Sequence, residues 1–333
     1  MLGAILGEAS NCFTTPETIF KQLVMERLRT QSTATFTLAQ FLSIISSEIQ
    51  FWRFQLDNSF LSNTIITRDN IRSLIDIILR QYANSQSKTN VSVWIDHTPP
   101  NILNSLLLGE YYPNAKFIHL IRDPRGVAAS ALRLAWGPNT PREFSTWWAF
   151  HIAHGFAMEQ HFQERCLRVR YEDILSNPES SIQRICDFCE IAFHPNMLSS
   201  QQFVIPSYSA EQHRLVGMPP ALNRALAWKS ELHPLTAWKI TSLLGELIDL
   251  LGYDRSLINA PQTSMTEKLK WTVGLGIQKV LSPIRRKQLR IRRKKLRHSE
   301  TNQKNGLFYP HPCKGDVTQN KQNLTTLYNG DFL

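Results

Sequence analysis

The sequence has no apolar run long enough for a membrane span, and it has few cysteines for its 333 residues. A transmembrane helix needs about 20 consecutive apolar residues. The apolar opening MLGAILGEASN is much shorter and has no basic residues before it, so we do not expect it to act as a signal peptide. Five cysteines in a chain of this length are typical of a reducing compartment. We therefore expect a cytoplasmic protein.

The sequence also lacks the paired motifs of a zinc site. Cys186 and Cys189 form a single C-x-x-C, inside a predicted helix whose apolar face they help to bury. His151 and His154 are spaced as metal ligands could be, but they follow a tryptophan-rich stretch in which core or cleft packing is the simpler interpretation. We expect no metal.

The sequence has almost no net charge over most of its length, and its net positive charge is concentrated at its end. The net charge is +10, but residues 260–333 hold 15 Lys/Arg against 4 Asp/Glu, a balance of +11, which leaves −1 for residues 1–259. Within this tail, RRKQLRIRRKKLR (285–297) has nine basic residues in thirteen. Runs of like charge are usually solvated. We predict a domain over residues 1–258 and a basic, partly helical or disordered tail over 259–333.

Strand and helix patterns alternate along residues 1–258. VSVWI (91–95), KFIHLI (116–121) and LRVRY (167–171) are short apolar runs typical of buried strands. Helices are predicted over GVAASALRLAW (126–136), over 176–191 with Ser176 or Asn177 as the N-cap, and over 234–253, ending at Gly252. Strand–helix alternation predicts an α/β protein with a mainly parallel sheet and helices on both faces.

Arg122 directly follows the predicted strand at 116–121 and directly precedes a predicted helix. Asp123 is the expected N-cap of that helix, and Pro124 is its first residue. Ligands of such sheets bind beyond the carboxyl ends of the strands, and a guanidinium offers a fork of donors that matches phosphate oxygens. Ser130, on the following helix, adds a neutral donor. The alternative is that Arg122 pairs with Asp123 or with another surface carboxylate.

Several segments together resemble sulfotransferases that use 3′-phosphoadenosine 5′-phosphosulfate (PAPS). RDPRGVAAS (122–130) resembles the family's 3′-phosphate motif, WIDHTPPN (94–101) its W-x-x-K-T-P strand end, and LRVRYEDILSNPESSIQRICDF (167–188) its V-R-Y-E-D-L segment. The resemblance covers roughly residues 1–254 and is closest to the bacterial and tyrosylprotein-type branch. It implies a three-layer α/β/α fold like that of P-loop NTPases, with PAPS as co-substrate.

The resemblance also implies roles for individual residues. Arg122 and Ser130 would bind the 3′-phosphate. Tyr171 matches a tyrosine that contacts the nucleotide in the family, although a core aromatic is equally compatible with its position. Glu17 aligns with the general base; the alternative is an acid in the first turn of a helix over TPETIFKQ. His97 stands where many relatives have a lysine that stabilises the bridging oxygen, and histidine donates fully there only when protonated.

Further nucleotide contacts are less well matched. Trp228 and Lys229 stand where relatives often have Lys-Trp in the reverse order, and Arg214 in the preceding loop is another candidate. Trp147 and Trp148 are candidates to line the acceptor site. The acceptor itself and the oligomeric state cannot be read from the sequence.

One family feature is absent. The family begins with a strand and a loop, G-x-x-R-S-G-T-T, that cradles the 5′-phosphosulfate, whereas this sequence aligns from the helix that follows the loop. We expect the missing segment to be encoded upstream of Met1. The alternatives are a nucleotide- or anion-binding protein with impaired catalysis, and a P-loop kinase-like phosphotransferase, which should show G-x-x-x-x-G-K-[ST] and does not. The basic tail could bind an anionic membrane or nucleic acid, with Trp271, Leu275 and Ile277 giving an apolar face.

Overall fold

A computed structural model describes residues 1–30, 35–37, 39–41, 44, 65–134, 137–199 and 220–302. The chain divides into two compact units, one formed by 1–17 and 83–305 and the other by 18–82 and 306–333. The second unit includes α2 (Phe20–Thr30) and most of α4 (Ile71–Ser85), and Phe36 and Ile66 form an isolated antiparallel bridge there. The first unit holds all the named strands of the described residues.

The four strands of the first unit form two parallel pairs. β1 (Cys12–Thr14) pairs with β2 (Val93–Ile95), and β3 (Phe117–Ile121) pairs with β4 (Cys166–Arg170). Three of these strands confirm the sequence prediction within two residues at each end. β1 was not predicted, because a run of three residues is too short to show a periodicity.

Helices pack on both faces of the β3–β4 pair. On one face, Phe117 stacks on Phe162 of α7 (Pro141–Phe162), with ring centroids 4.1 Å apart. On the other face, Val169 lies in a core cluster with buried residues of α1 (Leu2–Gly7), α8 (Tyr171–Ser176) and α9 (Pro178–Cys189). Cys12 of β1 belongs to the same cluster, so both strand pairs share this core. The arrangement confirms the predicted α/β fold with helices on both faces.

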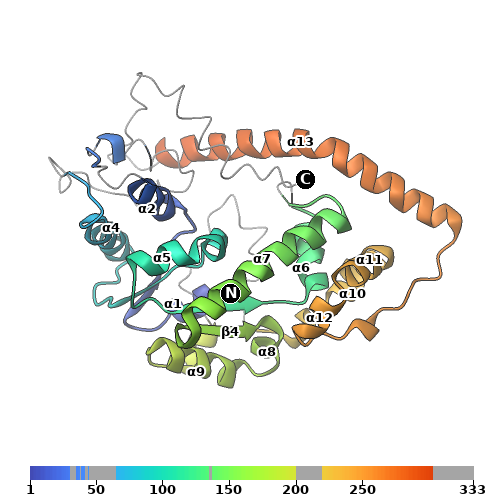
Figure 1. The fold of residues 1–333 in the computed structure, drawn as a ribbon, viewed down its shortest axis with the longest axis horizontal. Helices are drawn as coiled ribbons and strands as arrows, with labels where there is room; N and C mark the ends of the chain where they lie inside the picture. Colours follow the sequence, from blue (N-terminus) through green and yellow to red (C-terminus); the bar gives the residue numbers. More distant parts are fainter. Residues whose placement is uncertain are drawn as a thin grey trace. The chain divides into compact units, whose positions relative to one another are not determined.

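A second core cluster joins the carboxyl end of β3 to the helices that follow it. Ile121 packs with buried residues of α6 (Pro124–Ala131), α7, α11 (Pro234–Leu244) and α12 (Glu246–Leu250). α6, α7 and α11 contact one another (Figure 1). The helix predicted over 234–253 is broken at Gly245, whose φ of +40° and ψ of −117° are not helical and favour glycine. Gly252, with φ of +74°, follows the last turn as predicted.

The predicted helix caps are mostly confirmed. The Asp123 carboxylate caps α6 by accepting a hydrogen bond from the Arg125 N–H at 2.8 Å, with Pro124 at the first helical position. Asn177 is the N-cap residue of α9 by position, but its side chain makes no capping hydrogen bond. The remaining elements are α5 (Ser105–Tyr111), α10 (Trp228–Glu231), α13 (Met265–Asn302) and 3₁₀ helices at Pro99–Asn104, Gln163–Arg165, Pro195–Ser199, Leu222–Arg224 and Arg255–Leu257.

The basic segment begins as one long helix. α13 runs from Met265 to Asn302 and contains Pro283. The domain boundary predicted near residue 258 falls between the 3₁₀ helix Arg255–Leu257 and α13, and it stays a prediction. Among the residues that the structure describes, none of the helices combines the length and hydrophobicity needed to cross a bilayer.

Candidate functional site

The first part of the site lies at the carboxyl ends of β1 and β2. The register places Thr14 opposite Ile95, so the residues that follow the two strands leave the sheet at the same edge. His97 Nε2 lies 3.4 Å from Glu17 Oε1, and both side chains are about 30% exposed, His97 at 28% and Glu17 at 31%. A carboxylate and an imidazole thus meet at the edge where α/β sheets bind their ligands.

Backbone contacts hold this edge in register. The Thr15 N–H donates to the Ile95 carbonyl at 2.9 Å, which extends the strand pairing one residue toward Glu17. The His97 ring packs against Gly3 of α1, where an added β-carbon would lie 3.1 Å from His97 Cγ. α2 begins at Phe20, so Glu17 lies in the loop after β1 and not in the first turn of a helix. The alternative interpretation of Glu17 as a first-turn acid is therefore wrong.

The second part of the site lies at the carboxyl ends of β3 and β4, which place Arg122 and Tyr171 next to each other. Ile121 and Arg170 are opposite one another in the register, and the Arg122 guanidinium stacks 4.4 Å from the centroid of the Tyr171 ring. A β-carbon on Gly126 would lie 3.0 Å from Arg122 Nε, so the guanidinium lies close against the first turn of α6. Ser130 is four residues after Gly126 and hence on the same face of that helix.

Arg122 and Ser130 are accessible to a ligand. Arg122 is partly exposed, and none of the carboxylates in the described part of the chain pairs with it. Ser130 is exposed, and its hydroxyl donates to the Val127 carbonyl at 2.9 Å. A serine hydroxyl can rotate to another acceptor. The two side chains therefore offer a guanidinium and a hydroxyl along one face of α6.

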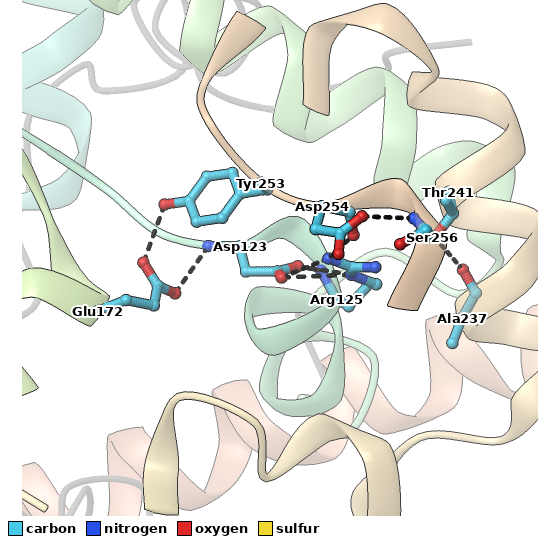
Figure 2. Close-up of polar contacts among 8 residues, drawn as sticks. All are labelled: Asp123, Arg125, Glu172, Ala237, Thr241, Tyr253, Asp254 and Ser256. Atoms are coloured by element: carbon cyan, nitrogen blue, oxygen red, sulfur yellow. Dashed lines mark hydrogen bonds and ion pairs between the residues drawn. The ribbon is translucent and has the colours of Figure 1, made fainter. Parts of the chain in front are cut away.

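Asp123 pairs with Arg125 and not with Arg122, which excludes Asp123 as the surface partner of Arg122. Arg125 is fully buried and donates to both carboxylate oxygens of Asp123, at 2.9 Å from Nε and 2.7 Å from Nη2 (Figure 2). Its Nη2 also donates to the Asp254 carbonyl at 3.0 Å, and its guanidinium stacks 4.4 Å from the Trp228 ring. Arg125 thus ties the start of α6 to the segment after α12.

Glu172 joins the same start of α6 to Tyr253. Its carboxylate accepts from the Asp123 N–H and from the Tyr253 hydroxyl, each at 3.0 Å (Figure 2). Burial raises the pKa of Glu172, although both hydrogen bonds oppose the rise. Burial, reinforced by the nearby Glu172, raises the pKa of Tyr253, so the phenol stays protonated and donates. The backbone directly after Arg122 is therefore held by Glu172 on one side and by Arg125 on the other.

Among the other predicted site residues, Trp228 and Lys229 lie on α10, which contacts α6, and their proposed nucleotide contacts stay predictions. Trp228 is buried and packs under Arg125. Lys229 is exposed, with its ammonium 6.0 Å from the Trp228 ring. Arg214 lies outside the described residues. Trp148, a candidate for the acceptor site, is buried in the second core cluster, and Trp147 packs against that cluster.

The cysteine and histidine candidates are packed side chains. Burial raises the pKa of Cys186 and of Cys189 to about 11, so both are protonated thiols near neutral pH. His151 Nδ1 lies 2.7 Å from the Trp147 carbonyl, and burial lowers the pKa of this histidine. In the part of the chain that the structure describes, no group of three or more His, Cys, Asp or Glu is arranged to hold a metal ion.

Sequence reasoning missed the supporting residues Arg125, Glu172 and Tyr253. One signal was present for Arg125: a cation in the first turn of a helix faces the positive end of the helix dipole, which is unfavourable unless a carboxylate compensates it. An arginine two residues after an N-cap aspartate therefore indicates a buried pair. Glu172 and Tyr253 meet across 81 positions, and no local pattern predicts such a contact.

Comparisons with known proteins identify the family of this chain. A family model described as "Sulfotransferase family" matches residues 1–195. A putative protein-tyrosine sulfotransferase of Caenorhabditis elegans is 25% identical over 218 residues, which cover 62% of this chain and 82% of that protein. A second, from Caenorhabditis briggsae, is 33% identical over 165 residues, which cover 44% of this chain and 55% of that protein. The chain thus spans about half the length of the second relative.

Two solved structures have a similar fold. The sulfotransferase domain from the curacin biosynthetic pathway is 18% identical and superposes with a TM-score of 0.53, covering 76% of this chain and 93% of that one. The sulfotransferase domain of an olefin synthase from Synechococcus PCC 7002 is also 18% identical, with a TM-score of 0.50 and coverages of 76% and 90%. The family match covers more than half of the sequence, and the chain therefore belongs to the sulfotransferase family, the enzymes that transfer sulfonyl groups.

Proposed function

We propose that this chain transfers the sulfonate of PAPS to a hydroxyl or amine acceptor, with Arg122 and Ser130 binding the 3′-phosphate of the nucleotide and Glu17 acting as general base. The observation that carries the nucleotide part is the Arg122 guanidinium, held against α6 and the Tyr171 ring with no described carboxylate to neutralise it. A partly buried, uncompensated guanidinium is a strong ligand for an anion.

The residues present fit a 3′-phosphate. Gly126 leaves room for the guanidinium where any β-carbon would crowd it, and Ser130 presents a hydroxyl one turn further along the same face. The Tyr171 ring limits the guanidinium to a narrow set of orientations, so little side-chain entropy remains to be lost on binding. Arg125 and Glu172 keep the backbone of this turn in place.

Glu17 and His97 supply the acid–base chemistry of the proposal. When PAPS is bound, it supplies an electrophilic sulfur, which forms a bond to the acceptor oxygen or nitrogen as the sulfur–oxygen bond to the 5′-phosphate breaks. Glu17 takes the proton that the acceptor loses. His97, at 3.4 Å from Glu17, donates a hydrogen bond when it is protonated, either to Glu17 or to the departing phosphate oxygen.

The relatives suggest a first acceptor to test. Both worm proteins described above are named as putative protein-tyrosine sulfotransferases. We therefore propose the phenolic hydroxyl of a tyrosine in a peptide as the first acceptor class. A phenol has a pKa of about 10, so it needs a base such as Glu17 to take its proton near neutral pH.

The test compares two nucleotides that differ in one phosphate. Arg122→Ala should weaken the binding of 3′,5′-ADP by about tenfold to a hundredfold, because a charge-assisted hydrogen bond contributes about 1.5–3 kcal/mol. The binding of 5′-AMP should change much less, since it lacks the 3′-phosphate. Isothermal titration calorimetry on the full chain measures both affinities.

A matched control is Arg184→Ala, which removes an exposed arginine from α9. It should leave both affinities unchanged. Ser130→Ala should lower the 3′,5′-ADP affinity by less than Arg122→Ala, because it removes a neutral donor. Equal losses of both nucleotides in Arg122→Ala, or a wild-type chain that does not prefer 3′,5′-ADP over 5′-AMP, would contradict the proposed site.

A further inference from the structure

α13 carries an apolar stripe that the described protein leaves uncovered. Seven large apolar side chains are between 48% and 81% exposed: Met265, Leu269, Val273, Ile277, Val280, Ile284 and Ile291. With about 100° of rotation per residue, these positions fall within an arc of about 120° on one side of the helix. Exposed apolar residues gathered on one face indicate an interaction surface, whereas scattered ones do not.

The opposite side of the same helix contacts α11 and its N-cap residue His233. Trp271 Nε1 donates to Thr236 Oγ1 at 2.9 Å, and the Trp271 ring stacks with His233 at a centroid distance of 6.5 Å. Trp271 lies roughly opposite the middle of the stripe on the helical wheel. The apolar face expected from the sequence, Trp271 with Leu275 and Ile277, is therefore wrong: Trp271 and Leu275 are partly buried, and Ile277 belongs to the exposed stripe.

The charge of α13 identifies the chemistry of a partner. The helix sequence contains twelve Lys/Arg and two Glu, a balance of +10, which equals the net charge of the whole chain. Among the described side chains, Lys268, Lys270 and Lys279 are exposed along the apolar part, and Arg285, Arg286 and Lys287 are exposed where the basic run begins. The partner must therefore be anionic and must also accept aliphatic side chains.

We propose that α13 binds the surface of an anionic lipid bilayer, lying in the interface with its stripe in the acyl region and its basic residues on the headgroups. Amphipathic helices with a basic polar face bind membranes in this manner. Nucleic acid would satisfy the charge but would leave the aliphatic stripe in water. A second copy of α13 would cover the stripe but would bring two strongly cationic helices together. The bilayer satisfies both features.

The experiment measures co-sedimentation of the full chain with vesicles of phosphatidylcholine containing phosphatidylserine, and with vesicles of phosphatidylcholine alone. The stripe variant is Val273→Asp with Ile277→Asp. Its matched control is Thr272→Asp with Gln278→Asp, which adds the same charge at exposed positions of the same helix outside the stripe. We expect the stripe variant to lose about tenfold or more in vesicle affinity and the control to lose about threefold or less, since burial of apolar side chains supplies most of the difference.

Two further measurements distinguish a bilayer from the other two candidate partners, which are nucleic acid and a second copy of the chain. Replacing Arg285, Arg286 and Lys287 with Gln should reduce the preference for phosphatidylserine, and binding of the wild-type chain should weaken as salt rises. Equal losses in stripe and control variants, together with tighter binding of duplex DNA or single-stranded RNA in a mobility-shift assay, would replace the membrane with nucleic acid. A dimer in light scattering that the stripe variant dissociates would assign the stripe to a second copy.

The proposal is independent of the nucleotide site. The stripe variant should bind 3′,5′-ADP as the wild-type chain does, and circular dichroism should show unchanged helix content. A wild-type chain that fails to bind phosphatidylserine vesicles would overturn the proposal, whatever its affinity for nucleotides.

Discussion

Arg122 and Arg125 are three positions apart, and the difference in their burial gives them different roles. Arg125 is fully buried, and its guanidinium is already occupied by the Asp123 carboxylate, the Asp254 carbonyl and the Trp228 ring. Arg122 is partly exposed and is held by the Tyr171 ring, which orients the charge without neutralising it. Removing a partner from a buried ion pair leaves an uncompensated charge, so Arg125 supports the fold while Arg122 remains able to bind an anion.

The role proposed for Glu17 gives a prediction at the same scale. Glu17→Gln is nearly isosteric and removes the ability to accept a proton. The turnover number for sulfonate transfer from labelled PAPS to a tyrosine peptide should fall by about 10²–10⁴, the usual contribution of a positioned general base. The affinity for 3′,5′-ADP should not change, because the base acts on the acceptor.

Two companion variants sharpen this measurement. Glu179→Gln, an exposed glutamate in the first turn of α9, should keep wild-type turnover. His97→Gln should reduce turnover less than Glu17→Gln if the imidazole only assists the carboxylate. A Glu17→Gln enzyme with near wild-type turnover, beside an inactive His97→Gln enzyme, would make His97 the base.

At the scale of elements, Gly155 marks a close approach of α7 to β3. A β-carbon on Gly155 of α7 would lie 2.1 Å from the ring of His119 on β3. The ring is 2% exposed, bonded to Glu159 through Nδ1, and packed edge-on against Phe156 at a centroid distance of 6.4 Å. It has little freedom to move aside. Gly155 is therefore what allows the long helix to lie close against the strand that ends at Arg122.

This contact predicts opposite effects for two Gly→Ala substitutions in helices. Gly155→Ala should lower the free energy of unfolding by about 1–3 kcal/mol, the usual range for overpacking, despite the better helix propensity of alanine. Gly274→Ala in α13, where an added β-carbon meets nothing within 4 Å, should be neutral or stabilising by up to about 1 kcal/mol. Urea unfolding followed by circular dichroism measures both, and a Gly155→Ala protein as stable as wild type would refute the tight contact.

For the whole molecule, net charge is divided between the nearly neutral residues 1–259 and the cationic helix α13. The first 259 residues sum to −1, so pH-dependent stability arises there from specific pairs and not from net repulsion. Burial lowers the pKa of His119, although its hydrogen bond to Glu159 opposes the shift. Burial alone would raise the pKa of Glu159, but hydrogen bonds from Arg168 and His119 outweigh it, so that pKa is lowered.

Both shifts have the same sign for stability. The unfolded chain protonates His119 near its usual pKa of about 6.5, whereas the folded chain resists protonation, so stability is lost as the pH falls below about 6.5. The contribution of Glu159 is present above its unfolded pKa of about 4.3 and is lost at still lower pH. We expect the free energy of unfolding in urea to decrease from about pH 7.5 to 5.5.

His119→Asn should reduce that decrease without abolishing it, because it removes one titrating group and keeps an amide donor toward Glu159, whereas His151, whose pKa burial also lowers, still titrates. His161→Asn, which removes an exposed histidine from the same helix as Glu159, should leave the pH dependence as it is in the wild type. A His119→Asn protein with the unchanged wild-type slope would show that other groups control the pH response.

The sequence by itself determined the features that depend on a few neighbouring residues. Asp123 and Pro124 cap α6 through contacts within three residues, and the apolar runs before Arg122 and Tyr171 form the parallel pair that sets both at one edge. The tertiary structure alone decided which distant groups meet. Glu17 reaches His97 through the register of β1, Arg125 is buried by Trp228 and Asp254, and the side of α13 that stays exposed depends on Trp271 reaching Thr236. Caps and strand patterns depend on local hydrogen bonds and periodicity, whereas burial and long-range pairing depend on how the completed elements pack.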